Sequence, residues 1–289
     1  MREFARPAAA LMFASLQLVM TGHGIAGSAS SEITFSPHRA VYDLKLDGSS
    51  TGSGVADVTG RIVYELTGSS CEGYAQSMRF VTQTTTQEGE TQLTDFRSSS
   101  WEAVPARRMR FSSMNVQNEQ PTERTQGAAA REQLAGPVTV ELARPAQRTI
   151  ELARDVYFPI QHSMALITAA REGKRILAVD LFDGSETGDK VYATSSVIGR
   201  LVVPGAKKTL ALLKDGDKLD RVPSWPVSVS YFKQGAEKGD ATPLYEMSFR
   251  IHDNGVTSSL RIDHGEFAIR GDLKELVYLE VSKCASAKP

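Results

Sequence analysis

The two cysteines of this 289-residue chain, Cys71 and Cys284, are the side chains with the most readily assigned chemistry. They lie more than two hundred positions apart, whereas redox-active thiols usually share a short C-x-x-C motif. In an oxidising compartment, two cysteines form one obvious pair. We therefore expect a structural disulfide that ties the carboxyl end to an early strand. The alternative is a redox-active pair.

The start of the chain indicates such a compartment. Arg2 and Arg6 precede a mostly apolar run over residues 8–20, and small residues follow up to Ala29. This is the layout of a secretory signal peptide, and the run is shorter than the ~20 residues that a membrane span needs. We predict that residues 1–29 are a cleaved signal peptide, with an uncleaved anchor as the alternative, and that residues 30–289 form a single exported domain.

Four histidines beyond the signal peptide are the next candidates for chemistry: His38, His162, His252 and His264. His252 and His264 flank a strand of about eight residues, so at ~3.3 Å per residue they lie about 25 Å apart and cannot share a metal ion. We expect each of these two to cap a turn or face water. His162 is assigned to solvent or a cap by default, and His38 to the entry of the first strand.

The sequence contains no H-E-x-x-H pair. The stretch GSETGDK at 184–190 lacks the spacing of a phosphate loop, and we interpret it as a glycine-rich hairpin connection. Arg108 and Arg110 alternate with Met109 and Phe111, which is typical of a strand with one wet face; a patch for anionic lipid head groups is the alternative. Carboxylate pairs leave a hydrolase or transferase open, but we expect no enzyme, no cofactor and no metal.

Composition limits the partners and the domain count. The net charge of −1 indicates no strongly charged partner and disfavours nucleic acid. The 41% hydrophobic content is enough for a globular core. We find no linker that would separate domains, and the most polar stretch, residues 115–133, fits a long excursion or exposed strands. We expect a monomer.

Period-two alternation of apolar and polar residues dominates the chain and indicates half-buried antiparallel strands. Its clearest examples are AVYDLKLDG, GPVTVELAR, RTIELAR, WPVSVSYF, LYEMSFRIHDNG and SSLRIDHGEFAIRG. The turn signals DNG at 253–255 and DHG at 263–265 predict a three-stranded meander near the carboxyl end. One helix is expected from Pro159 to just before Gly173. The run KRILAVDLFDG is nearly all apolar, so we expect a strand covered on both faces.

These residues resemble the envelope integrity protein B family of periplasmic proteins of Gram-negative bacteria, known as a domain of unknown function. The resemblance rests on HRAVYDLKL, SGVADVTGRIVYEL, Cys71 with Tyr74, LFDGS at 181–185, and Cys284 near the end. It implies an open β-barrel, or β-spiral, of about fourteen antiparallel strands with one or two helices, and a disulfide between Cys71 and Cys284. It also implies a periplasmic location, a role in envelope integrity without an assigned reaction, and a distant likeness in shape to lipoprotein carriers.

Two functional hypotheses follow. In the first, the protein supports the envelope by binding other envelope proteins or envelope components. In the second, it is a carrier that shelters a lipid or acyl chain on the concave face of the curled sheet. The volume of the interior separates them, because a carrier needs an apolar cavity of ~300 Å³ or more. For the inward-facing Val, Leu, Ile and Phe residues we favour a filled core.

Overall fold

A computed structural model describes residues 32–153, 155–206, 210–235 and 242–284. The chain divides into two units, Met1–Glu32 and Ile33–Pro289, of which the second carries the fold. The signal peptide predicted for residues 1–29 lies outside the described residues. Within the described residues, fifteen strands form one sheet and two helices accompany it. The fold class predicted from the sequence, an open barrel of about fourteen strands with one or two helices, is confirmed.

The first half of the chain is a run of long strands. Their bounds are β1 His38–Ser49, β2 Val55–Ser69, β3 Gly73–Thr86, β4 Thr91–Glu102, β5 Arg108–Gln117, β6 Gln120–Ala130, β7 Val138–Arg144 and β8 Arg148–Leu152. The second half contains both helices. It comprises β9 Val156–Tyr157, α1 Pro159–Arg171, β10 Ile176–Leu181, β11 Tyr192–Ile198, α2 Gly216–Leu219, β12 Ser224–Lys233, β13 Tyr245–His252, β14 Thr257–Asp263 and β15 Phe267–Tyr278.

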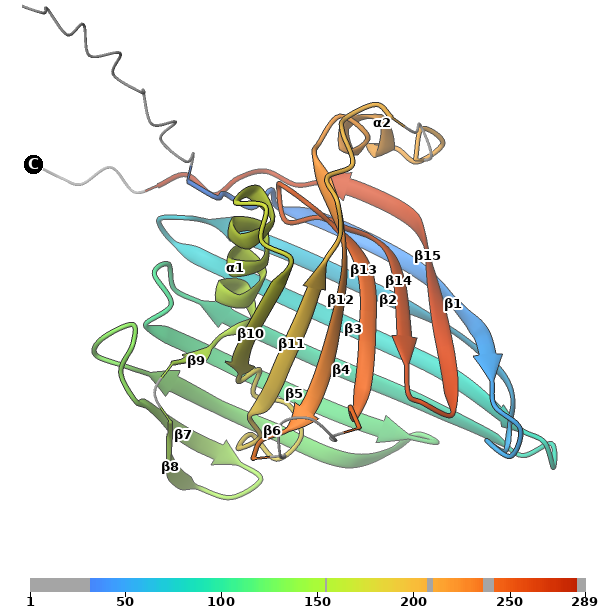
Figure 1. Cartoon of the computed structure of the whole chain (residues 1–289). Coiled ribbons are helices and arrows are strands. Elements are labelled where there is room, and N and C mark those ends of the chain that lie inside the picture. The colour runs from blue at the N-terminus through green and yellow to red at the C-terminus, as the bar shows by residue number, and fades with distance from the viewer. Residues whose placement is uncertain (1–31, 154, 207–209, 236–241, 285–289) are drawn as a thin grey trace, which may run out of the picture. The chain divides into compact units, whose positions relative to one another are not determined.

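The strand order shows how the sheet curls. Strands β1 to β8 follow one another as antiparallel neighbours, β15 pairs with β1 on its other side, and β14 to β10 continue from there. Figure 1 shows β2–β6 as one wall and β10–β14 as the other, with β1 and β15 joining them. The two edges are β8 and the short β9, which are successive along the chain but not hydrogen-bonded to each other. The sheet is therefore a nearly closed barrel with one open seam, which leaves few free edges.

The alternation of side chains agrees with the sequence. In β7, Val138, Val140 and Leu142 are buried while the residues between them are exposed. The predicted meander is confirmed as β13, β14 and β15, and the glycines of its two turns, Gly255 and Gly265, have φ of 83° and 82°. Positive φ is available to glycine at no steric cost, which explains why the DNG and DHG signals identify these turns.

The sequence led us to expect exposed strands at residues 115–133 and a strand covered on both faces in KRILAVDLFDG. Residues 115–133 are strands as far as Ala130, since they form the end of β5 and all of β6, but Thr125 and Ala129 are buried, so these strands are only partly exposed. The prediction that KRILAVDLFDG is covered on both faces is wrong, because Ile176 is 66% exposed and Ala178 is exposed as well. This strand, β10, lies between β11 and the two-residue β9, so its outward side chains have no layer above them. The residues 184–190 lie in the connection of the antiparallel β10–β11 pair, as predicted.

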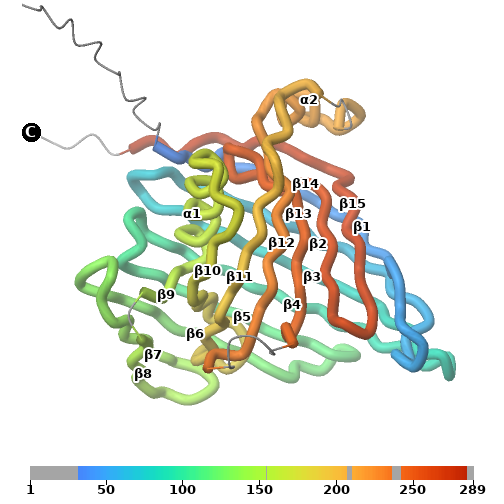
Figure 2. Tube along the Cα trace, in the orientation of Figure 1, coloured from blue at the N-terminus to red at the C-terminus, as the bar shows by residue number. Residues whose placement is uncertain are grey.

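The interior is divided into three apolar clusters. One surrounds α1, one lies along the seam between β5–β8 and the β9–β10 region, and one lies under β1, β2 and β15. Helix α1 sits inside the curl and not on its outer surface (Figures 1 and 2). It begins at Pro159 and ends before Gly173, whose φ is 74°, as the sequence indicates. The helix therefore supplies apolar surface that both walls of the sheet bury.

The two cysteines meet where the end of the chain passes the β2–β3 turn. Cys71 and Cys284 are joined by a disulfide with Cα atoms 5.8 Å apart and a sequence separation of 213 residues. The backbone leads up to it from β15, where Leu279 N–H donates to Pro37 carbonyl. The disulfide thus attaches the segment after β15 to the start of β3.

We expect Cys71→Ser or Cys284→Ser to lower the melting temperature of the oxidised protein. Closing a loop of this length stabilises by about 5 kcal/mol at most in the chain-entropy model, and residual unfolded structure reduces that figure. Differential scanning calorimetry measures the shift, and wild type in reductant should melt like the variants. Equal melting of wild type with and without reductant would contradict the expectation.

Candidate functional site: an interior chamber beside an anchored helix

The amino end of α1 is held by one buried carboxylate. Glu102, the last residue of β4, is 2% exposed. Its Oε2 accepts the Ile160 N–H at 2.8 Å and its Oε1 accepts the Gln161 N–H at 2.9 Å. Because Pro159 has no N–H, these are the first free donors of the helix. Burial raises the pKa of Glu102 to about 7, while the two backbone bonds and nearby Arg131 act to lower it.

A buried arginine ties the same helix end to the open seam. Arg131, just after β6, is 6% exposed and lies over the Phe158 ring, 4.4 Å from its centre. Its guanidinium donates to the carbonyls of Ala106 and Val156, each at 2.8 Å, and to Gln161 Oε1 at 2.9 Å. Charge-assisted bonds of this kind are stronger than neutral ones. Arg131 therefore connects β6, β9 and α1 across the edges that the sheet leaves unpaired.

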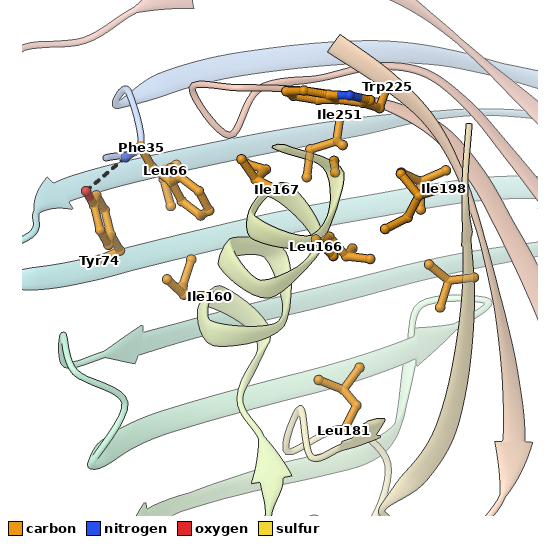
Figure 3. Close-up of a cluster of buried hydrophobic side chains, with 14 of the residues drawn as sticks. Phe35, Leu66, Tyr74, Ile160, Leu166, Ile167, Leu181, Ile198, Trp225 and Ile251 are labelled. Atoms are coloured by element: carbon orange, nitrogen blue, oxygen red, sulfur yellow. Dashed lines mark hydrogen bonds between the residues drawn. The ribbon is translucent and has the colours of Figure 1, made fainter. Parts of the chain in front are cut away.

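The carboxyl end of α1 is anchored to the opposite wall. The Arg171 guanidinium donates from Nε to Asp253 Oδ1 at 2.7 Å and from Nη2 to Asp253 Oδ2 at 2.8 Å. Asp253 lies in the β13–β14 turn, so this bidentate pair holds the helix against the second wall. Between its two anchors the helix packs against the apolar cluster that Figure 3 shows, with Leu166 and Ile167 almost completely buried. The helix position is thus fixed from both walls of the sheet.

Beside this helix lies a chamber of about 510 Å³. It falls within the ~300–1,000 Å³ typical of ligand pockets. The wall is mostly aliphatic and aromatic. One side comes from β1–β3 (Tyr42, Ile62, Tyr64, Met78, Phe80), the other from β12–β14 (Tyr231, Tyr245, Met247, Phe249, Ile251, Leu260, Ile262), and α1 adds Pro159, Ile160, His162, Ser163 and Leu166. The completely filled core favoured from the sequence is therefore wrong.

The polar groups of the chamber are few and mostly engaged. The Tyr42 hydroxyl donates to the Thr257 carbonyl at 2.6 Å, and the Tyr64 hydroxyl donates to Gln76 Oε1 at 3.1 Å. Burial raises the pKa of both phenols above the ordinary value, so both stay protonated donors. Such hydroxyl groups can fix the orientation of a ligand without making the wall of the chamber polar.

A smaller compartment of about 200 Å³ adjoins the chamber. The two spaces share Tyr64, Gln76, Met78, Pro159 and Asp183 as lining residues. The smaller one is more polar, because its remaining wall includes Ser98, Ser100, Ser113 and Ser185. We call the pair the main chamber and the serine compartment.

Asp183 lies at the boundary of these two spaces. Its Oδ1 accepts the Ser185 N–H at 2.8 Å, and burial raises the pKa of its carboxyl above the usual range. The neighbouring Gly184 leaves no room for a side chain, since an added Cβ would lie 2.4 Å from the Phe111 ring. The stretch LFDGS thus places a partly buried carboxyl at the junction of an apolar and a polar space.

Two of the four histidines lie in environments that differ from those we expected. His162 and His252 are 6% and 3% exposed, so assigning them to solvent or a cap is wrong. His252 Nε2 lies 2.8 Å from Ser258 Oγ, and His162 faces the apolar cluster around its own helix. Burial lowers the pKa of each to about 4, so both are neutral at pH 7. His264 is exposed and stacks on Phe267, and His38 is the first residue of β1.

The other candidates for chemistry occupy ordinary positions. Arg108 and Arg110 are exposed while Met109 and Phe111 are buried, which confirms the simple alternation. Among the described residues, no three His, Cys, Asp or Glu side chains gather in a way that could hold a metal ion. Within the same part of the chain, neither helix is long and apolar enough to cross a bilayer.

Sequence reasoning missed the two carboxylates that define the site. Glu102 lies 58 residues before the helix that it anchors, and no local pattern reports that contact. Asp183 has a detectable signal, because it is one of only two acidic residues, with Asp180, in the mostly apolar run at 176–184. The serines of β4 and β5 also show a pattern, SSS at 98–100 and SS at 112–113. This pattern indicates a polar compartment only once it is known which face of these strands points into the barrel.

A nearly closed antiparallel sheet around an interior chamber defines this molecule as a barrel-like β protein. The family model described as EipB-like matches residues 29–280, and the chain belongs to this family. The cell envelope integrity protein EipB of Brucella abortus (strain 2308) is 34% identical over 281 residues, which is 97% of each chain. The crystal structure of a beta-barrel-like protein of domain of unknown function DUF1849 from Brucella abortus is similar with a TM-score of 0.75 and 33% identity, covering 85% of this chain and 99% of that one.

The buried carboxylate of Glu102 provides a pH-dependent prediction. The folded state keeps its proton up to about pH 7, whereas a free glutamate releases it near 4.5. Its contribution to stability is therefore complete below pH 4.5 and is lost as the pH rises to about 7, by up to about 3 kcal/mol.

Glu102→Gln removes this titration, so the free energy of unfolding of wild type minus that of the variant should fall from pH 5 to pH 8. Urea unfolding at both values measures it, and comparing the two proteins cancels the opposite contribution of the buried histidines. Glu141→Gln, at an exposed position on β7, is the matched control and should show a constant difference. A constant difference for Glu102→Gln as well would disprove the assignment.

Proposed function

We propose that the chain is a periplasmic, non-enzymatic protein that supports cell-envelope integrity by binding an apolar chain of an envelope component inside its curled sheet. The observation that carries this proposal is the main chamber of about 510 Å³ with its mostly apolar wall. The envelope role rests on membership of the EipB-like family and on the name of the Brucella abortus relative, cell envelope integrity protein EipB. Export rests on the predicted signal peptide, and the Cys71–Cys284 disulfide is of the kind that persists in an oxidising compartment.

The two compartments favour an amphiphile over a purely apolar molecule. An acyl chain in the main chamber would contact aliphatic and aromatic groups on both walls. Its polar end would reach the serine compartment, where Gln76 and Asp183 lie at the boundary. A carboxyl whose pKa is raised by burial can donate a hydrogen bond to a carbonyl or ester oxygen. The ligand class is therefore an acyl chain with a neutral or weakly acidic polar end.

This proposal combines the two hypotheses drawn from the sequence. Binding of an envelope component is kept from the first, and shelter of an acyl chain is kept from the second. Binding of other envelope proteins is the weaker part, because a pure scaffold has no need of an apolar chamber. The monomer expected from the sequence stays part of this proposal.

The test begins with protein that is expressed with its own residues 1–29 and recovered from the periplasm without denaturant or detergent. Native mass spectrometry should detect a fraction with one bound amphiphile, and solvent extraction should release a molecule with an acyl chain. Wild type that carries no such molecule, and that binds no added palmitate saturably, would refute ligand binding.

Matched variants locate the ligand. Met78→Trp adds bulk inside the chamber, and we expect it to lower the bound fraction about tenfold or more because the chain can no longer fit. Gln83→Trp adds the same group at an exposed position of the same strand and should leave the bound fraction unchanged. Melting curves of both variants check that each is folded, and Leu260→Trp serves as a second chamber variant if Met78→Trp is unstable. Equal ligand in Met78→Trp and Gln83→Trp would place the ligand elsewhere.

A further inference from the structure

The wall formed by β2–β7 has a second large space on its outer face. It is a hollow of about 890 Å³ that lies outside the barrel. Its side chains alternate along the strands with those that face inward. On β3, Ser77 is exposed and lines the hollow, whereas Met78 lines the main chamber; on β7, Glu141 is exposed and Leu142 is buried. We call this space the outer hollow.

A row of polar side chains crosses the floor of the outer hollow. The strand register makes its members successive cross-strand neighbours on β2 to β6: Glu65, Ser77, Ser99, Ser112 and Gln126. At ~4.8 Å between strands, the row is about 19 Å long. Its three serine hydroxyls form no hydrogen bond with another described residue. By contrast, the paired serines Ser228 and Ser248 of the other wall bond each other at 3.0 Å.

A tryptophan ring lies beside this row. Trp101 is two positions after Ser99 on β4, and it lines the outer hollow with part of its surface exposed. Its Nε1 donates to the Glu72 carbonyl at 3.2 Å, and an added Cβ on Gly73 would lie 3.0 Å from the ring. On the other side, the Arg110 guanidinium lies 5.8 Å from the ring centre. These contacts hold an aromatic surface in place next to the row of free hydroxyls.

The charges around the outer hollow are few. Among its lining residues, Arg110 is positive and Glu65 and Glu141 are negative, which gives a net charge of −1. In the next row of the same face, the carboxylate of Asp95 is bound by two arginines. An anionic polymer such as nucleic acid needs an excess of positive charge that this surface does not offer. The polar groups of the hollow are therefore matched by a neutral ligand.

We infer that the outer hollow binds a neutral glycan chain. The C–H face of a sugar ring packs on an indole ring, and sugar hydroxyls donate to and accept from serine hydroxyls and the Gln126 amide. The length of the row suits several consecutive sugar rings. A peptide fits less well, because β2 to β7 are each paired on both sides and offer no free edge for an added strand. The inference goes beyond the proposed function, since the hollow and the main chamber lie on opposite faces of the sheet.

Isothermal titration calorimetry of the mature protein with three neutral tetrasaccharides tests the inference. The probes are chitotetraose, cellotetraose and maltotetraose, and we expect at least one to bind with a Kd of about 1 mM or below. Tryptophan fluorescence gives a second readout. Trp225 is 5% exposed and lies in the interior cluster, so a saturable change in emission reports Trp101. Binding of none of the three at about 10 mM, leaving a protein as the occupant of the hollow, would overturn the inference.

Matched variants locate the sugar. Trp101→Ala should weaken binding about fivefold because ring stacking is lost, and Ser99→Ala should weaken it about threefold because one hydroxyl is lost. Thr91→Ala removes a hydroxyl from an exposed position of the same strand outside the hollow and should bind like wild type. Melting curves check that each variant is folded, and Ser99→Ala remains a test if Trp101→Ala is unstable.

The same variants separate this inference from the proposed function. Trp101→Ala and Ser99→Ala should carry as much chamber ligand as wild type, and Met78→Trp should bind the tetrasaccharide like wild type, because the two spaces are on opposite faces. Tetrasaccharide binding that neither Trp101→Ala nor Ser99→Ala weakens would place the sugar elsewhere and overturn the inference.

Discussion

Helix α1 is held at both ends by carboxyl side chains that come from opposite walls of the sheet. Glu102 on β4 accepts the first two free N–H groups of the helix, and Asp253 in the β13–β14 turn receives the Arg171 guanidinium. A curled sheet with one unpaired seam needs something inside it that both walls can bury. The helix does this, and its two anchors set how far apart the walls stand. The size of the main chamber follows from that separation.

The side chains that anchor α1 and the disulfide stabilise different parts of the barrel. Arg131 joins β6, β9 and α1 beside the seam, where backbone pairing is absent. The Cys71–Cys284 bond attaches the end of the chain to the start of β3. Together they hold the barrel without filling it, so apolar surface remains in the chamber that no side chain of the protein covers. Removing apolar surface from water is the main driving force for binding an acyl chain.

Much of the fold could be predicted because its signals are local. Alternation in GPVTVELAR, the turn glycines Gly255 and Gly265, and the helix bounded by Pro159 and Gly173 each depend on neighbouring residues. The site could not be predicted in the same way. The burial of Glu102 depends on a helix 58 residues away, the chamber depends on the separation of two walls, and the exposure of Ile176 depends on the absence of a covering layer. Periodicity shows which side chains face inward but not whether they meet.

The central claim is that the interior is a binding chamber and not merely loose packing. A crystal structure of the protein recovered directly from the periplasm tests this claim most directly. The account expects elongated electron density between α1 and the inner faces of β2 and β13, with a polar end near Asp183. Side chains from the two walls in van der Waals contact across that space, with no density between them, would contradict it.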